Sequence, residues 1–569
     1  MIRRWAYVGL TAVLAVVVAV WAVPDLGRDG FAFAGFAPDA SPPLPSLSPD
    51  LFLWFGSAEI VLLAVGVGLL VQIYSTAYLG HHPRYRSYAL VIILFLLAMI
   101  AVVGTTNLWV LLVGWEVMGV CSYLLIGHEW ETPAARAGAA KAFLVTRVAD
   151  LGLVMAIIVI GETYGTYDII GAQVAESENP RNATAIGLLV LVAVIGKSAQ
   201  FPLQSWLPDA MPGPTPITAL IHAATMVAAG VYLAARLFQL YSDSTVVLTT
   251  MAVIAAITML LGALFALVQT DLKRALAWST VSQLALMLSA VAAADPEVGL
   301  DHLVAHGVFK ALLFLGCGCL MHAVGTSALS AMGGLRRPMP VTFWTMTIGF
   351  AALAGLVPTA GFFTKDSVLD AIVRSANGDS MSNLAVGTAW GLLVVALLTS
   401  VVTAAYAARL WALVFLGPPV ERLDTHRTPL AMSGPLVVLA VGTFALSIGQ
   451  TVHLGVAAIS TVIAVAGTGV GLEVARRGVS PRWAAPVLAA EAGLDRPFSR
   501  WLPVSASAVA RTVVDLDRDA VDVYPRGGAS AVQAVSRGLG RAQSRNVQRY
   551  ATVLAAGALV LVVVAVMVR

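Results

Sequence analysis

Charged residues are scarce in this chain. Only 11% of its 569 residues are Asp, Glu, Lys or Arg, whereas 59% are hydrophobic. A soluble globular protein has about 25% charged residues. The composition therefore excludes a soluble fold and indicates an all-α polytopic membrane protein. The net charge is only +3, which gives no sign of a nucleic-acid partner.

Cysteine is also scarce, and the three residues (Cys121, Cys317 and Cys319) lie inside apolar segments. Side chains two positions apart on a helix point in different directions, so Cys317 and Cys319 predict neither a disulfide nor a metal site. The chain also lacks a Walker A motif and a cysteine set for an iron–sulfur cluster. We therefore expect no cofactor in this chain and no energy source of its own, so energy would have to come from an ion gradient or a partner.

Lysine is rare among the cations. Five of the 34 lysine and arginine residues are lysine, and three of those five lie in apolar segments. An ionisable side chain at the bilayer centre costs at least ~2.5–3.5 kcal/mol. Arginine stays protonated, whereas a buried lysine can release its proton. The lysines at membrane depth are therefore predicted to take up and release protons.

Long apolar segments recur along the chain. About 20 residues span a bilayer as a helix, and the segments predict about fifteen transmembrane helices, at roughly 5–23, 51–79, 86–104, 107–127, 138–160, 186–208, 215–240, 245–269, 272–294, 299–323, 339–375, 384–416, 432–450, 454–476 and 549–568. Basic residues gather in alternate loops. The positive-inside rule then places the N-terminus in the cytoplasm and the C-terminus outside, in a bacterial inner membrane.

Two of these helices are expected to be broken. GKSAQFPLQSWLPD contains Lys197, and LVPTAGFFTKDS contains Lys365. Breaks at membrane depth are tolerated where protein or a watery cavity surrounds them. The motifs lie five helices apart, an odd offset that reverses topology, so they predict two inverted five-helix repeats. The expected parts are N-terminal membrane helices (1–85), a first half-channel (86–240), a second half-channel (245–416), additional membrane helices (417–480), an amphipathic lateral helix (481–548) and a C-terminal anchor (549–569).

The expected lateral helix is amphipathic. Val509, Val513 and Leu516 recur at helical spacing, with charged residues on the other faces. Such a helix lies along a membrane surface. Pro525 is expected to interrupt it.

Ionisable residues recur inside the apolar segments of the first half. Glu116 lies near the centre of the fourth helix. Burial favours the neutral form of a lysine and a carboxylate neighbour favours the charged form, so a Glu116–Lys197 pair of variable coupling would switch the lysine. Arg147 and Asp150 are three apart on the fifth helix and are expected to pair locally.

Histidines continue the series. His222 follows the first break, and His302, His306 and Lys310 are spaced by four, which places them on one helical face. No third ligand accompanies the histidines, so a proton relay is favoured over a metal site. Lys365 and Asp366 end the series. Together these residues predict conduction of protons or small cations.

Several motifs resemble one known family. GWEVMGVCSYLLIG, KAFLVTRVAD, QTDLKRALAWSTVSQ, HLVAHGVFKALLF and GFFTKD closely resemble the antiporter-like subunit L family of respiratory complex I, and RNVQRY after the amphipathic segment resembles its end. The resemblance implies a proton-pumping subunit of NADH–quinone oxidoreductase. Glu116 and Lys197 would be the coupled pair, His222, His302, His306 and Lys310 the connecting residues, Lys365 with Asp366 the exit, and Arg147 with Asp150 a tuning pair.

The same resemblance implies partners. FMN, iron–sulfur clusters and quinone would belong to other subunits, and the neighbouring antiporter-like subunit would contact this chain. The family usually has sixteen membrane helices, one more than we count. Open alternatives are a subunit of a multisubunit cation/proton antiporter, of a membrane-bound hydrogenase or of an inorganic-carbon uptake complex, or a purely structural clamp.

Overall fold

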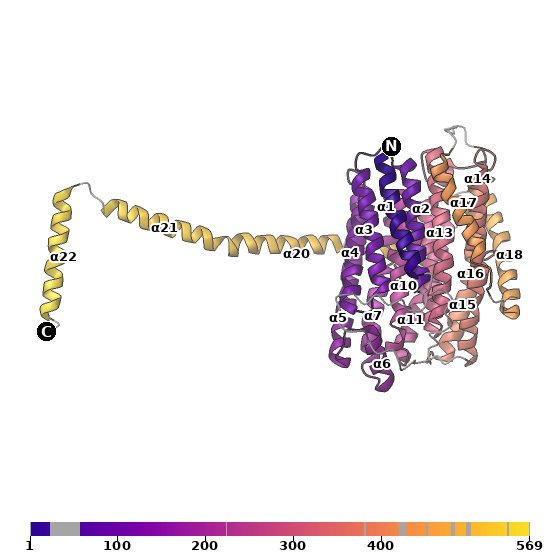
Figure 1. Ribbon diagram of the computed structural model, residues 1–569, viewed down its shortest axis with the longest axis horizontal. Helices are drawn as coiled ribbons and strands as arrows, with labels where there is room; N and C mark the ends of the chain where they lie inside the picture. Colours follow the sequence, from indigo (N-terminus) through magenta and orange to yellow (C-terminus); the bar gives the residue numbers. More distant parts are fainter. Residues whose placement is uncertain are drawn as a thin grey trace. The chain divides into compact units, whose positions relative to one another are not determined.

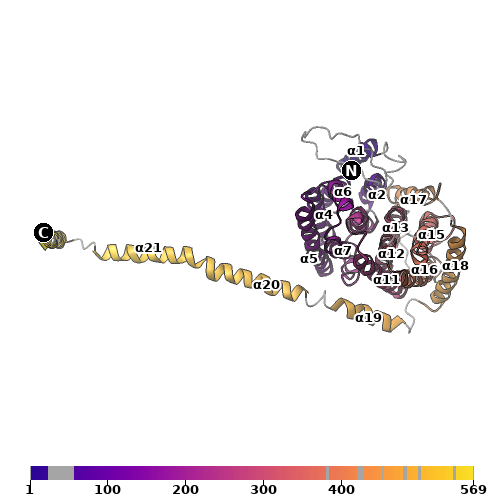
Figure 2. The same cartoon turned by 90° about the horizontal axis from the view of Figure 1, so that it is seen from below.

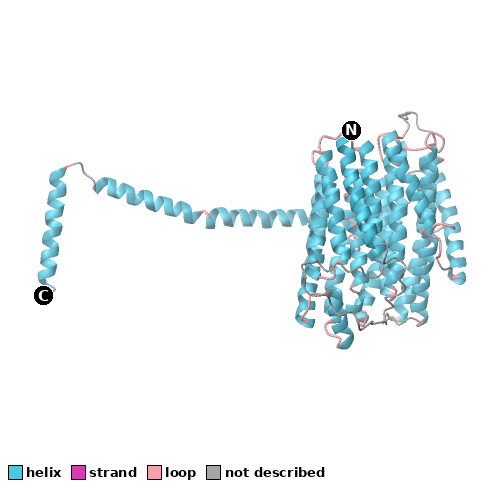
Figure 3. Ribbon diagram, viewed as in Figure 1, coloured by secondary structure: helices cyan, strands magenta, loops and turns pink. Residues whose placement is uncertain are grey.

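The protein is described by a computed structural model that covers residues 2–22, 57–223, 225–379, 383–419, 428–450, 453–478, 484–496, 502–542 and 546–567. It divides into two compact units, Met1–Phe498 and Ser499–Arg569. Within these ranges the regular secondary-structure elements are helices (Figure 3). The predicted all-α class is confirmed.

The first unit is a bundle of helices that run side by side (Figure 1). Its N-terminal half contains α1 (Ile2–Ala22), α2 (Ser57–Tyr78), α3 (Tyr85–Gly104), α4 (Leu108–Ile126), α5 (Pro133–Tyr164), α6 (Ile169–Glu178), α7 (Ala183–Lys197), α8 (Trp206–Asp209), α9 (Thr215–Ala223), α10 (Met226–Arg236) and η2 (Phe238–Leu240). Its C-terminal half contains α11 (Thr245–Val268), α12 (Leu272–Ala292), α13 (Pro296–Val324), η3 (Leu329–Ala331), α14 (Pro340–Ala354), α15 (Ala360–Asn377), α16 (Val386–Phe415), α17 (Leu430–Ala445), α18 (Leu454–Arg476) and α19 (Ala485–Arg496).

Many of these helices have the length and composition of membrane spans. Eleven in the described ranges, α22 included and α9 with α10 taken as one, are long and apolar enough to cross a bilayer, and four further apolar helices are shorter. Each predicted segment overlaps one of them. A multi-pass membrane protein is therefore confirmed, while fifteen as the number of crossings stays a prediction.

Two helices form the centre of the bundle. All residues of α12 except Arg274 are buried, and α13 is buried over most of its length. Viewed along the helices, α12 and α13 lie within the bundle, and α5 and α18 lie at opposite edges (Figure 2). The buried polar side chains of α12 and α13, which include Gln283, His302 and Lys310, are therefore far from bulk solvent.

The same backbone hydrogen bonds occur in both halves. The amide of Leu108, the first residue of α4, donates to the carbonyl of Tyr167 (2.9 Å), and the amide of Leu272, the first residue of α12, donates to that of Ser327 (2.9 Å). Likewise, α5 and α13 both end in a left-handed glycine, Gly165 and Gly325. α4 and α12 are five spanning helices apart, as are α5 and α13, so the predicted five-helix repeat accounts for these matches. The inverted relation of the halves stays a prediction.

Both expected breaks are present, and the structure has a third. α7 ends at Lys197 and α8 begins at Trp206, while α14 ends at Ala354 and α15 begins at Ala360. The segment expected as one helix over 215–240 is also divided, because α9 ends at Ala223 and α10 begins at Met226. Thr225 there has a non-helical backbone (φ −132°, ψ −103°), and its hydroxyl donates to the carbonyl of Leu220. No proline or glycine marks this break in the sequence.

The segment expected as one lateral helix consists of several helices. α19 belongs to the first unit, and the second unit contains α20 (Leu502–Leu516), a π-helical turn η6 (Asp517–Val521), α21 (Val523–Ala542) and α22 (Val547–Met567). The expected interruption at Pro525 was wrong. Pro525 is the third residue of α21, where an amide has no intrahelical partner to lose. The irregular turn lies just before it.

Candidate functional site

Helices α4, α5 and α7 place four ionisable side chains together. Lys197, the last residue of α7, is fully buried, and its Nζ lies 3.4 Å from Oδ2 of Asp150 on α5. The same Nζ donates to the carbonyl oxygen of Trp115 (3.3 Å) and lies 4.7 Å from the centre of the Trp115 ring. The Trp115 indole donates to the other oxygen of Asp150 (2.5 Å). Lys197 is therefore held by one carboxylate, one carbonyl and one aromatic face.

The pairing differs from the sequence prediction. Glu116 forms its ion pair with Arg147, and both side chains are about one quarter exposed. Between these described residues neither a Glu116–Lys197 pair nor an Arg147–Asp150 pair is formed. Successive helical residues are about 100° apart, so Trp115 faces the interior while Glu116 faces outward. On α5, Asp150 is buried toward α7, and Arg147 lies on the outward side with Glu116.

The histidines of α13 connect helices α12 and α15. Nδ1 of His302 lies 2.8 Å from the hydroxyl of Thr364, and its Nε2 lies 3.3 Å from the amide oxygen of Gln283. His306 follows one turn later, with its ring centre 6.4 Å from that of His302. His302 and His306 thus lie on the same side of α13. Thr364 precedes Lys365, so this contact links the histidines to the second break.

His222 and His306 carry ring nitrogens without protein partners. The ring of His222, in the last turn of α9, lies 4.5 Å from that of Phe314 and is fully buried. Both ring nitrogens of His222 lack a hydrogen-bond partner among the described residues. The same holds for Nε2 of His306. A buried polar group costs about 1–3 kcal/mol when it is left unsatisfied. Such positions favour contact with water.

Lys310 and Lys365 are bound by neutral oxygens. Lys310 is fully buried and donates to the carbonyl of Leu276 (3.2 Å) and to the hydroxyl of Ser279. Lys365 donates across the second break to the carbonyl of Leu353, near the end of α14. Neither lysine has a carboxylate within ion-pair distance in the described ranges. Both differ in this respect from Lys197.

The two broken-helix lysines lie at different positions relative to their breaks. Lys197 is itself the last residue of α7, whereas Lys365 lies in the second turn of α15 and reaches back to the end of α14. The ammonium group of Lys197 contacts α4 and α5, whereas that of Lys365 lies at the C-terminal end of α14. The negative end of the helix dipole stabilises a cation there.

Several neutral polar residues of the site had no place in the sequence prediction. Trp115, Ser279, Gln283 and Thr364 each bind one of the predicted ionisable residues. The prediction considered titratable groups only. A signal did exist, because Ser279 and Gln283 belong to a run of polar residues in an otherwise apolar segment.

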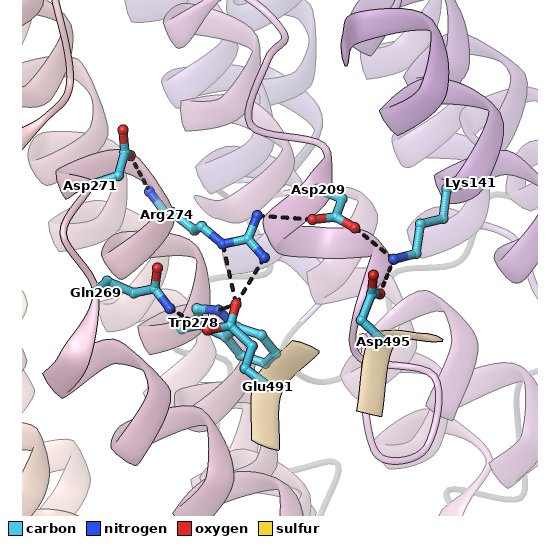
Figure 4. A network of polar contacts seen from close by, with 8 residues as sticks. All are labelled: Lys141, Asp209, Gln269, Asp271, Arg274, Trp278, Glu491 and Asp495. Carbon is cyan, nitrogen blue, oxygen red and sulfur yellow. Dashed lines mark hydrogen bonds and ion pairs between the residues drawn. The ribbon is translucent and has the colours of Figure 1, made fainter. Parts of the chain in front are cut away.

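A second polar network, also missed, binds α19 to the bundle (Figure 4). Glu491 is the one buried residue of α19 among those described. One of its carboxylate oxygens accepts from Arg274 (2.8 Å) and from the Trp278 indole (3.0 Å), and the other accepts from Gln269 (2.6 Å). Glu491 is thus saturated with donors from the loop before α12 and from α12 itself.

The network continues into the first half of the bundle. The guanidinium of Arg274 also donates to Asp209 on α8 (2.9 Å), and Asp209 accepts from Lys141 on α5 (2.6 Å). Lys141 in turn pairs with Asp495, one turn after Glu491 on α19 (Figure 4). We call Lys141, Asp209, Arg274, Glu491 and Asp495 the α19 latch. It joins α19 to both halves.

We expect Glu491→Ala to release α19 from the bundle. The change leaves the donors of Gln269, Arg274 and Trp278 without their common acceptor, and each unsatisfied donor costs about 1–3 kcal/mol. Hydrogen exchange of the α19 amides should accelerate by at least about tenfold, since about 1.4 kcal/mol corresponds to that factor. Glu473→Ala is the matched control, because among the described residues Glu473 pairs only with the exposed Arg476 and Arg477. Unchanged α19 exchange in Glu491→Ala would contradict the latch.

The arrangement is suited to moving protons. Ionisable side chains lie on α4, α5, α7, α9, α13 and α15, and most are buried between apolar helices. No group of three His, Cys, Asp or Glu in the described ranges is placed to hold a metal ion. The chemistry within reach of these side chains is protonation and deprotonation.

Comparisons with known proteins agree with this picture. Residues 105–389 match the family model described as "NADH:quinone oxidoreductase/Mrp antiporter, TM". NADH-quinone oxidoreductase subunit L of Mycobacterium tuberculosis is 37% identical over 503 residues, which cover 84% of this chain and 76% of that protein. F(420)H(2) dehydrogenase subunit L of Methanosarcina mazei is 38% identical over 70% of this chain and 63% of its own.

A solved structure shows a similar fold. The chain resembles one in the structure of the Mrp complex from Dietzia sp. DQ12-45-1b, with a TM-score of 0.63 and 28% sequence identity. The match covers 90% of this chain and 55% of that one. The present chain therefore corresponds to about half of that larger polypeptide.

Proposed function

The chain belongs to the NADH:quinone oxidoreductase/Mrp antiporter family of membrane subunits, and we propose that it is a proton-translocating subunit of an NADH–quinone oxidoreductase. Energy would come from quinone reduction in partner subunits that hold FMN and iron–sulfur clusters. The neighbouring antiporter-like subunit would be the nearest partner. The protein would lie in a bacterial inner membrane with a cytoplasmic N-terminus and an external C-terminus.

The observation that carries this proposal is the fully buried ammonium group of Lys197 beside Asp150. A buried ion pair gives little net stability, because the desolvation of two charges offsets their attraction. A pair of this kind at membrane depth is more useful as a switch. If Asp150 moves away from Lys197, the lysine loses its one carboxylate neighbour and releases its proton. If the pair reforms, the lysine takes up another.

In this proposal the proton then passes along the histidines. Ring nitrogens of His222 and His306 have no hydrogen-bond partner among the described residues and can bind water, and water chains carry protons between such groups. Lys310 receives the proton from this part of the series. Lys365, at the second break, receives it next and passes it toward the outside. Two inverted half-channels, each with a lysine at a broken helix, would then act in sequence.

The Glu116–Arg147 pair would tune this switch. Arg147 donates to the carbonyl oxygen of Glu116 (3.0 Å) and forms an ion pair with its carboxylate. A β-carbon placed on Gly119 would lie 3.2 Å from Arg147 Nη2 and 3.4 Å from Lys197 Nζ, so the two cations are close neighbours. A change at Glu116 would therefore alter the charge that Lys197 faces through Arg147.

An Mrp-type cation/proton antiporter subunit is the second candidate. The similarity to the Dietzia Mrp structure favours it, and the same buried lysines would serve it. The relatives of 37–38% identity named as subunit L of oxidoreductases and dehydrogenases favour the first proposal.

Purification of the native protein in gentle detergent tests the choice. We expect flavin, iron–sulfur absorbance and NADH-dependent quinone reduction to co-purify with the chain. A small membrane-only assembly without these would overturn the proposal and favour the antiporter. The matched test on the same preparation is sodium-dependent proton release, which the oxidoreductase proposal does not require.

A further inference from the structure

The side chain that follows Lys365 faces a different helix. Asp366 is 1% exposed, and its two carboxylate oxygens accept from the backbone amide of His453 and from the hydroxyl of Ser460, both at 3.3 Å. His453 directly precedes α18, and Ser460 lies in the second turn of that helix. Asp366 therefore leads from the second break to the N-terminal end of α18. The series of ionisable residues described above does not include α18.

His453 continues this path toward solvent. Its side chain is 43% exposed, and Nδ1 lies 3.7 Å from Oδ2 of Asp370, one turn after Asp366 on α15. Asp370 also accepts from Arg374 (3.0 Å), and Arg374 pairs with Asp295 before α13 (2.7 Å). Asp295 lies in a loop that the positive-inside rule places outside. Exposure therefore rises from Asp366 to His453 at the predicted release face.

The charged surroundings of His453 are simple. α15 presents Asp366 and Asp370 to it, with Arg374 and Asp295 beyond Asp370. α16 also packs against α18, and its one charged residue is Arg409. Gly471 of α18 lies against Ala405 of α16, so Arg409 is level with the far end of α18. Carboxylates are therefore the nearest charges to His453.

We propose that His453 is the proton-release station that follows Lys365 and Asp366, the exit pair that the family resemblance already implies. This inference rests on the proposed function. The Lys365 ammonium gives its proton through water to the Asp366 carboxylate, which leaves a neutral amine and a carboxylic acid. The acid passes the proton to the imidazole of His453, which becomes imidazolium while Asp366 is a carboxylate again. The imidazolium then releases the proton to outside water.

The competing explanation is that Asp366 only caps α18. A carboxylate at a helix N-terminus is stabilising by itself, and His453 would then contribute no more than its backbone amide. The two explanations differ in what the His453 side chain does. If His453 is the release station, its ring carries protons. If Asp366 only caps α18, any side chain at position 453 suffices.

The test uses the assembled complex in sealed vesicles, with NADH-driven proton release measured against the outside pH. We expect His453→Gln to lower the rate by at least about tenfold, within the range for loss of a positioned acid–base group, and to flatten the dependence of the rate on outside pH. Added imidazole should restore transport in this variant. Ser460→Ala, which removes the other contact of Asp366 but no titrating group, should keep the wild-type pH profile.

The outcomes separate the two proposals. An unchanged rate and profile in His453→Gln, or no rescue by imidazole, overturns the release station while Lys197→Ala still tests the translocation itself. Should His453→Gln fail to assemble, Asp370→Asn provides the second test. Removing the neighbouring carboxylate disfavours imidazolium, so the pH midpoint should move downward, and an unmoved midpoint contradicts the proposal.

Discussion

Lys197→Ala is expected to reduce proton transport by roughly two orders of magnitude, which is the scale of losing one essential proton carrier. Alanine leaves Asp150 without a cation and removes the group that takes up the proton. The measurement is the initial rate of NADH-driven proton movement in vesicles, divided by the rate of quinone reduction. Assembly should persist, because a buried ion pair contributes little net stability and its carboxylate can take up a proton once it is alone.

Lys197→Arg is the informative companion. Arginine keeps the positive charge beside Asp150 but does not release a proton in proteins. If titration is the role of Lys197, the arginine variant should transport as poorly as the alanine variant. If Lys197 is a structural charge, as in a clamp subunit, arginine should preserve transport. Near-normal transport in Lys197→Ala would refute the proposed function outright.

Asp150→Asn is expected to have the second largest effect. Removing one partner of a buried ion pair costs about 3–5 kcal/mol if the other stays charged, and Lys197 avoids this cost by giving up its proton. The lysine is then neutral throughout the cycle, and transport should fall by at least about tenfold. Asparagine can still accept from the Trp115 indole, so the local packing is preserved.

Glu116→Gln provides the matched comparison on the same helices. Its pair with Arg147 is about one quarter exposed, and exposed pairs contribute only about 0–1 kcal/mol. We expect a clear but smaller loss of transport than in Asp150→Asn, because Arg147 then brings an uncompensated charge closer to Lys197. A larger loss of transport in Glu116→Gln than in Asp150→Asn would instead favour the Glu116–Lys197 pair that the sequence suggested. Both rates are measured in the same vesicle assay.

Lys197 and Lys365 show which features of the site a sequence motif can predict. Both were predicted as lysines of broken helices, and both breaks are present. Their positions relative to the break differ, since Lys197 ends α7 and Lys365 lies within α15. The side chain of Lys365 reaches back across the break to the carbonyl of Leu353. A four-carbon side chain can span a break, and sequence position does not reveal it.

Composition and apolar segment length by themselves determined the membrane class, the helical fold and the residues that stay ionisable at membrane depth. These follow from the cost of placing charges and unpaired backbone in hydrocarbon, which applies residue by residue. Tertiary structure alone decided the partners: Asp150 rather than Glu116 for Lys197, Thr364 and Gln283 for His302, and Glu491 for Arg274. Partners depend on how helices rotate and pack against one another, and helical periodicity leaves that rotation open.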